Sequence, residues 1–227
     1  MRAISISAVF FLILCAPLAW ASGGIISGTV IAKGVKSTTS SVTVANHERG
    51  RFWTAPDESL VVSKGGGLKY AVVSLAGVPG NVGVSTVKVD NKVYCFVPHV
   101  QAATVGSTLT STNSDSAMHN VHLSQEGRTL LNIALPNKGS KIRRDGFFKK
   151  TGLVEVACNA HKWMKAFVAV FDHPYFAVTD ETGRFTITNV PAGRHRIEVW
   201  HEKLGTLTKE VVVKDGGKSK VEFLFSK

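Results

Sequence analysis

The sequence has little of what several classes of protein require. Its 227 residues include three cysteines, too few for a disulfide-dense scaffold. Its 21 glycines and 7 prolines follow no triplet period, which excludes a collagen-like chain. Apolar residues make up 44% and charged residues 19%, a balance typical of a folded protein and not of a disordered one. No nucleophile–base motif, phosphate-binding loop or pair of carboxylates stands out, so we expect a protein that is not an enzyme.

Long apolar runs are lacking except at the start of the chain. Arg2 precedes an apolar stretch over residues 8–16, and Ala19-Trp20-Ala21 has the small-x-small pattern of a cleavage site. This stretch is too short for a spanning helix and is typical of a secretory signal peptide. We therefore expect residues 1–21 to be removed, and the mature protein to be periplasmic or secreted, with no membrane span.

Acidic residues are scarce, at 16 against 27 lysines and arginines, which gives a formal net charge of +11. The cations cluster in residues 138–150, where Asp145 alone opposes Lys138, Lys141, Arg143, Arg144, Lys149 and Lys150. This segment is either a solvated loop or a docking patch for an acidic redox partner. Export and the lack of a base-stacking motif argue against nucleic acid.

Helical periodicity is also lacking, and short β-branched or alternating runs recur instead. Strands separated by glycine- and proline-containing turns indicate an all-β fold built of β-sandwiches, and the resemblances given below imply that there are two β-sandwiches. Residues 34–67 are predicted to form strands and long loops. The expected strands are 25–32, 68–75, 93–97, 108–112, 119–124, 153–157, 166–171, 184–189, 194–200, 208–214 and 220–225.

The most informative segment lies between two of these strands. Cys158, His161 and Met164 stand at positions i, i+3 and i+6 in one short loop. Thiolate and thioether sulfur together with imidazole suit copper, and a trigonal blue-copper site needs one Cys, two His and a weak axial Met. The second histidine must come from elsewhere, and His119 and His122 are both candidates.

These residues resemble the cupredoxins, and among them the amicyanin-like proteins. The resemblance rests on Phe96-Val97-Pro98 with Val105-Gly106, on Asn113-Ser114-Asp115 with His119-Asn120-Val121-His122, and on Cys158-x2-His161-x2-Met164. It implies a Greek-key sandwich over residues 86–173 that binds one type 1 copper ion. It also implies that His119, Cys158 and His161 are the equatorial ligands, that Met164 is axial, and that Asn120 hydrogen-bonds to the Cys loop.

The flanks resemble a second family, the carboxypeptidase regulatory-like (transthyretin-like) sandwich. Residues 176–185, followed by Val190-Pro191-Ala192-Gly193, are similar to the middle of that family's sequence. The family's first strand and a second strand are missing from this C-terminal part, and residues 26–30 and 70–75 resemble them. We therefore expect residues 22–85 and 174–227 to form one sandwich that the cupredoxin domain interrupts. The whole chain is similar to exported methylamine-utilisation-like proteins.

Several alternatives remain open. Cys95 and Cys158 could form a disulfide, which would leave no thiolate for copper, and His99 could be an extra ligand. The favoured function is a carrier of single electrons for a redox protein such as a c-type cytochrome or a periplasmic dehydrogenase. The alternatives are a copper-handling module without redox turnover and an adhesion or scaffold protein with a vestigial metal site.

Overall fold

The structure is a computed structural model that describes residues 22–38, 41–46 and 51–226, without side chains at 41–46 and 51–53. The expected signal peptide, residues 1–21, lies outside the described residues. All regular elements in the described part of the chain are β-strands, which confirms the all-β prediction. Among these residues there is no helix with the length and apolar character needed to cross a membrane.

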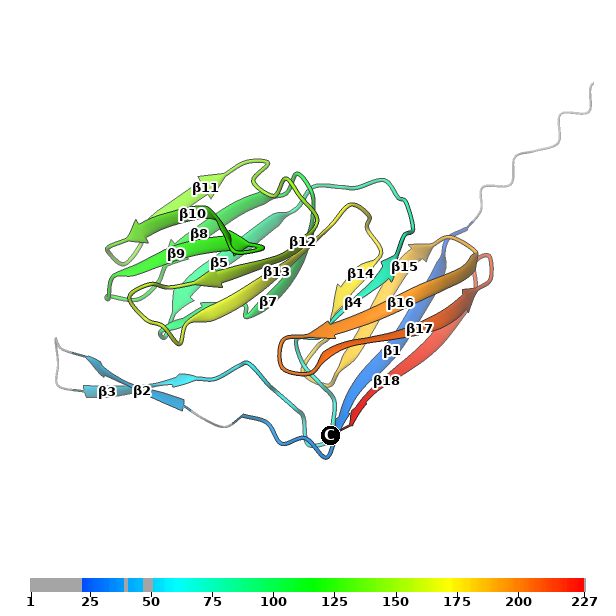
Figure 1. Cartoon of the computed structure of the whole chain (residues 1–227), viewed down its shortest axis with the longest axis horizontal. Helices are drawn as coiled ribbons and strands as arrows, with labels where there is room; N and C mark the ends of the chain where they lie inside the picture. The colour runs from blue at the N-terminus through cyan, green and yellow to red at the C-terminus, as the bar shows by residue number, and fades with distance from the viewer. Residues whose placement is uncertain (1–21, 39–40, 47–50, 227) are drawn as a thin grey trace, which may run out of the picture.

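Strands from both ends of the chain build one sandwich, here called the outer sandwich (Figure 1). Its sheets have the strand orders β15-β1-β18 and β14-β4-β16-β17. β1 lies between β15 and β18, and β4 lies between β14 and β16, so each sheet needs a strand from the N-terminal part. The strands are β1 (Gly24–Lys33), β4 (Val72–Ala76), β14 (Phe176–Val178), β15 (Arg184–Val190), β16 (Gly193–His201), β17 (Gly205–Val213) and β18 (Lys218–Ser226).

The alternation of buried and outward-facing side chains along these strands explains the core of the outer sandwich. In β4 and β16, Leu75 pairs with Ile197 and Val73 pairs with Val199. All four are buried in one apolar cluster with Ile26 of β1. Because successive side chains on a strand point to opposite faces, the residues between them face away from this core. The two ends of the chain therefore share one hydrophobic core.

The middle of the chain builds a second sandwich, here called the inner sandwich. Its sheets have the orders β10-β9-β12-β13-β7 and β11-β8-β5-β6. The chain enters it through residues 77–85 and leaves through 172–175, where the predicted boundaries at 85/86 and 173/174 lie. That the outer sandwich is a regulatory-like domain stays a prediction. The strands are β5 (Thr86–Lys92), β6 (Cys95–Val97), β7 (Val100–Thr104), β8 (Thr108–Asn113), β9 (His119–Gln125), β10 (Arg128–Leu135), β11 (Lys141–Arg144), β12 (Gly152–Ala157) and β13 (Lys165–Phe171).

A two-stranded hairpin, β2 (Ser41–Asn46) and β3 (Arg51–Pro56), projects from the outer sandwich (Figure 1). It accounts for the strands expected within 34–67. Just where the hairpin ends, the Cys95 thiol donates to the carbonyl of Pro56 at 3.5 Å. Cys95 is therefore a half-buried contact between the inner sandwich and this segment.

The basic segment contains a strand that the sequence does not reveal. β11 pairs with β8 at the edge of its sheet, with Lys141 opposite Thr112 and Arg144 opposite Leu109. We expected a loop or docking patch, and charged residues at an edge strand are a common way to discourage pairing with other chains. The strands β5, β7 and β10 were also missed.

Candidate metal centre

Three of the four predicted donors meet at one end of the inner sandwich, and the fourth, Met164, is buried at the end of the same loop as Cys158. The Cys158 loop connects β12 to β13 and is closed by two backbone hydrogen bonds. The Cys158 amide donates to the carbonyl of Met164 at 3.3 Å, and the Met164 amide donates to that of His161 at 2.9 Å. Cys158 and Met164 are each 2% exposed, so the strand ends hold both sulfur side chains inside the fold.

His119 approaches this loop from the start of β9 and is fully buried. One ligand atom each from His119, Cys158 and His161 lies within 4.8 Å of the other two. Within the described residues, no other set of three or more His, Cys, Asp or Glu side chains meets this condition. The Sγ of Cys158 is 3.6 Å from Nδ1 of His161. Such convergence of a thiol and two imidazoles from separate segments is the arrangement that a trigonal metal site needs.

The two ring nitrogens of His119 have different surroundings. Nε2 hydrogen-bonds to Oδ2 of Asp115 at 3.0 Å, whereas Nδ1 is buried without a hydrogen-bond partner. An unpaired buried nitrogen is costly unless something binds it. A metal-ligating histidine commonly uses one nitrogen for the metal and gives the other to a carboxylate. The orphaned Nδ1 and the bonded Nε2 therefore fit a metal ligand.

The protonation equilibria of the site favour a thiolate. Burial raises the pKa of Cys158, but His119 and nearby backbone groups outweigh it and hold that pKa below its ordinary value. Burial lowers the pKa of His119, yet Asp115 and Cys158 outweigh it and raise that pKa to about 9. Burial and the neighbouring His119 lower the pKa of His161. The thiolate of Cys158 and the neutral imidazole of His161 are the forms that bind a metal, whereas His119 must release its proton when a metal binds.

Asn120 fixes the position of the Cys158 loop. Its Oδ1 accepts from the Asn159 amide at 2.6 Å and from the Cys158 thiol at 3.3 Å. Its Nδ2 donates to Oδ1 of Asn132 at 2.8 Å. The predicted hydrogen bond from Asn120 across to this loop is confirmed.

Two aromatic side chains enclose His161. The ring of Tyr94 meets His161 edge-on at 5.3 Å and His119 at 5.5 Å, measured between centroids. Trp163 lies 5.1 Å from His161, is 37% exposed, and donates from Nε1 to the carbonyl of Tyr94 at 3.2 Å. The role of Tyr94 was missed, because nothing in its local sequence shows that Asp115 accepts from its amide.

The alternative ligands lie elsewhere. Cys95 and Cys158 are both free, so the structure contains no disulfide between them. His122 hydrogen-bonds to Oδ1 of Asn159 and to the hydroxyl of Thr129. His99 bonds to Glu202 of the outer sandwich. Neither histidine belongs to the group of converging donors.

Comparisons with known proteins find similarity over parts of the chain only. A family model described as polysaccharide lyase family 4, domain II, matches residues 148–221. No curated protein matches the chain.

Similar solved structures include a purple cupredoxin from Nitrosopumilus maritimus, at 26% identity over 38% of this chain and 99% of that one, with a TM-score of 0.33. A reduced mutant form of amicyanin is 21% identical over 44% of this chain and 98% of that one, with a TM-score of 0.34. The copper-containing nitrite reductase of Thermus scotoductus is 23% identical over 41% of this chain and 25% of that one, with a TM-score of 0.32. The chemistry of the site therefore rests on its own donors and their geometry.

Proposed function

We propose that this chain is an exported protein that binds one copper ion and carries single electrons between redox partners. The observation that carries this proposal is the meeting of a buried thiol with two imidazoles, one of which has an orphaned nitrogen. Soft sulfur and imidazole donors together select copper over calcium and magnesium, which prefer oxygen ligands.

Each donor has a distinct task in this proposal. His119 through Nδ1, Cys158 through its thiolate and His161 would hold the ion, and Met164 would be a fourth, weaker ligand. When bound, a type 1 copper ion gains and loses one electron. The nearby carboxylate of Asp115 keeps the His119 ring in place through Nε2.

The chain holds these donors through a network that does not depend on the ion. Asn120 ties the Cys158 loop to β9, and the backbone bonds of the loop fix the segment up to Met164. Donors that are already in place need little rearrangement when the charge of the bound ion changes, which favours fast electron transfer. We therefore propose an electron carrier, and not an enzyme or a scaffold.

The metal end of the inner sandwich also supports a docking surface. The Gly139 amide donates to the carbonyl of Asn113 at 2.7 Å, so the loop between β10 and β11 borders the turn that carries Asp115. Lys138 lies in this loop and Lys141 directly follows it, whereas Arg143 and Lys150 pair with Asp145 and Glu126.

Met118 and Trp163 are exposed at the same end, at 48% and 37%. We propose that an acidic redox protein, such as a c-type cytochrome or a periplasmic dehydrogenase, docks here. Lysines around an apolar patch would steer such a partner towards His161.

Voltammetry of the copper-loaded protein tests the proposal. We expect a reversible one-electron couple that persists over repeated cycles, and electron exchange with an acidic cytochrome that slows as salt is added. Copper that binds tightly without a reversible couple would contradict electron transfer and favour a copper-handling module. Failure to bind copper at all would leave a scaffold with a vestigial site.

A further inference from the structure

The two sandwiches meet through strand faces that turn away from their own cores. On the outer sandwich, Val72 and Trp200 are neighbours on β4 and β16, next to the core residues Val73 and Val199. On the inner sandwich, Leu153 and Ala169 are paired on β12 and β13. These four side chains belong to one apolar cluster between the sandwiches. An isolated sandwich would present these faces to water, so their apolar character marks an interface.

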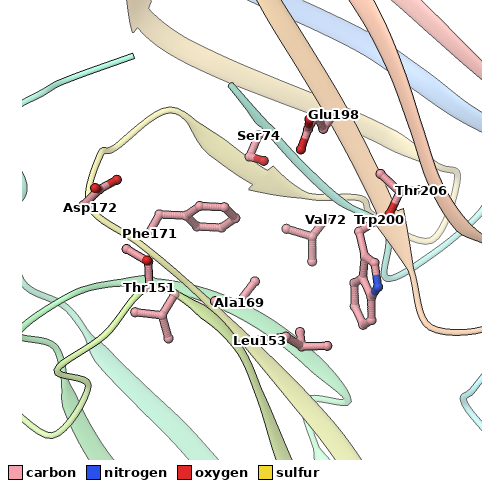
Figure 2. Close-up of a pocket in the computed structure, with 12 residues that line it drawn as sticks. Val72, Ser74, Thr151, Leu153, Ala169, Phe171, Asp172, Glu198, Trp200 and Thr206 are labelled. Carbon is pink, nitrogen blue, oxygen red and sulfur yellow. The ribbon is translucent and has the colours of Figure 1, made fainter. Parts of the chain in front are cut away.

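This interface is close-packed in one part and open in another. Val72, Val100 and Ala169 are buried there, but beside them lies a cleft of about 390 Å³. Figure 2 shows Phe171 and Val72 projecting into the space between the sheets, with Trp200 at one end and Asp172 at the other. Ligand pockets typically have volumes of ~300–1,000 Å³ and favour domain interfaces. The cleft is therefore large enough for a small organic molecule.

The polar groups around the cleft favour a ligand with positive charge. Asp172 and Glu198 supply two carboxylates, and Ser74, Thr151 and Thr206 supply hydroxyls. Among the described residues that line the cleft there is no lysine, arginine or histidine, although the protein carries a net charge of +11. Glu198 also accepts from Nη2 of Arg196 at 2.5 Å, which leaves its second oxygen for another donor.

We propose that this cleft binds a small organic cation with a flat apolar body, of the arylalkylamine class. The apolar body lies between Phe171 and Trp200, and the ammonium group donates to the carboxylate of Glu198. Aromatic walls favour a flat ring, and a charge-assisted hydrogen bond is stronger than one between neutral groups. The two observations select one chemical class, because the walls favour apolar surface, and the carboxylates of Asp172 and of Glu198, whose second oxygen Arg196 leaves available, favour positive charge.

This site is separate from the candidate metal centre. Phe171, which lines the cleft, is the last residue of β13, whereas Met164 of the metal loop lies just before the first residue of that strand. The two sites are therefore at opposite ends of β13. Ligand binding in the cleft therefore needs no copper, and the proposal stands or falls independently of electron transfer.

Three probes with the same ring test the proposal by calorimetry on the full-length mature chain. They are 2-phenylethylamine, 2-phenylethanol and phenylacetate, which differ in charge at one end. We expect the amine to bind about tenfold more tightly than the alcohol, and phenylacetate to bind more weakly than both. Equal affinities, a preference for phenylacetate or no binding of the amine would overturn the proposal.

Variants then assign the binding to the cleft. Glu198→Gln should reduce the preference for the amine over the alcohol to less than about threefold. Glu210→Gln is the matched control, because Glu210 lies on the neighbouring strand and is paired with Arg194 in the same way. Ser74→Phe should block all three probes by filling the cleft. An effect of Glu210→Gln equal to that of Glu198→Gln would contradict the assignment, as would undiminished binding in a folded Ser74→Phe protein.

Discussion

Replacing Asn120 with alanine should weaken both the fold and the metal centre, because this one side chain joins β9 to the Cys158 loop. Asn120 is 8% exposed, so water cannot easily replace the bonds that it makes. The substitution leaves the Asn159 amide and the Cys158 thiol without their acceptor. A buried donor left unpaired costs about 1–3 kcal/mol, and a thiol is a weaker donor than an amide. We therefore expect the metal-free protein to lose about 2 kcal/mol of unfolding free energy.

Copper affinity should fall as well. Groups that orient metal ligands typically contribute ~10–100-fold to affinity, and Asn120 orients the loop that carries three of the four proposed ligands. Urea denaturation of the metal-free protein measures the first effect, and competition with a chelator measures the second. Asn132→Ala is the control, because it removes the partner of Nδ2 and leaves both Oδ1 bonds intact. Wild-type stability and copper affinity in Asn120→Ala, or equal losses in the two variants, would refute this reasoning.

Three further predictions concern the rest of the chain. Burial lowers the pKa of His201 from 6.5 to about 4, so as the pH falls this histidine takes up a proton at a higher pH in the unfolded state than in the folded state. The unfolding free energy should therefore fall by roughly 1–3 kcal/mol as the pH drops from about 6.5 to 4, and His201→Gln should flatten that slope in urea titrations. Residues 174–227 expressed alone should not fold, because β1 and β4 are missing from the middle of their sheets, and a cooperative melt of this fragment would be the contrary result. Lys141→Glu should slow electron exchange with an acidic cytochrome more than Arg144→Glu, because Lys141 lies nearer the metal end of β11, and stopped-flow rates that fall equally would contradict this.

Local patterns in the sequence predict much of the inner sandwich and its candidate site. The spacing of Cys158, His161 and Met164 indicates a ligand loop because all three lie within seven residues between two apolar strands. The choice between His119 and His122 needed the cupredoxin resemblance, because two histidines three residues apart on a strand give no further local signal.

Other features depend on contacts between distant segments and leave no local pattern. Tyr94 reaches the site because Asp115, 21 residues away, accepts from its amide. β11 is short and rich in lysine and arginine, so it has the composition of a loop, and its pairing with β8 decides its conformation. The cleft between the sandwiches depends on how two complete sheets face one another, which the alternation within each strand does not specify.

The visible absorption spectrum on titration with Cu(II) is the most direct test of the central claim, that Cys158 binds copper as a thiolate. The wild-type protein should develop one intense thiolate-to-copper charge-transfer band that saturates at one equivalent. Cys158→Ser should abolish this band, and Cys95→Ser should leave it unchanged, because Cys95 contacts Pro56 and lies outside the group of donors. A colourless wild-type protein with copper bound, or a band that survives in Cys158→Ser, would contradict the account.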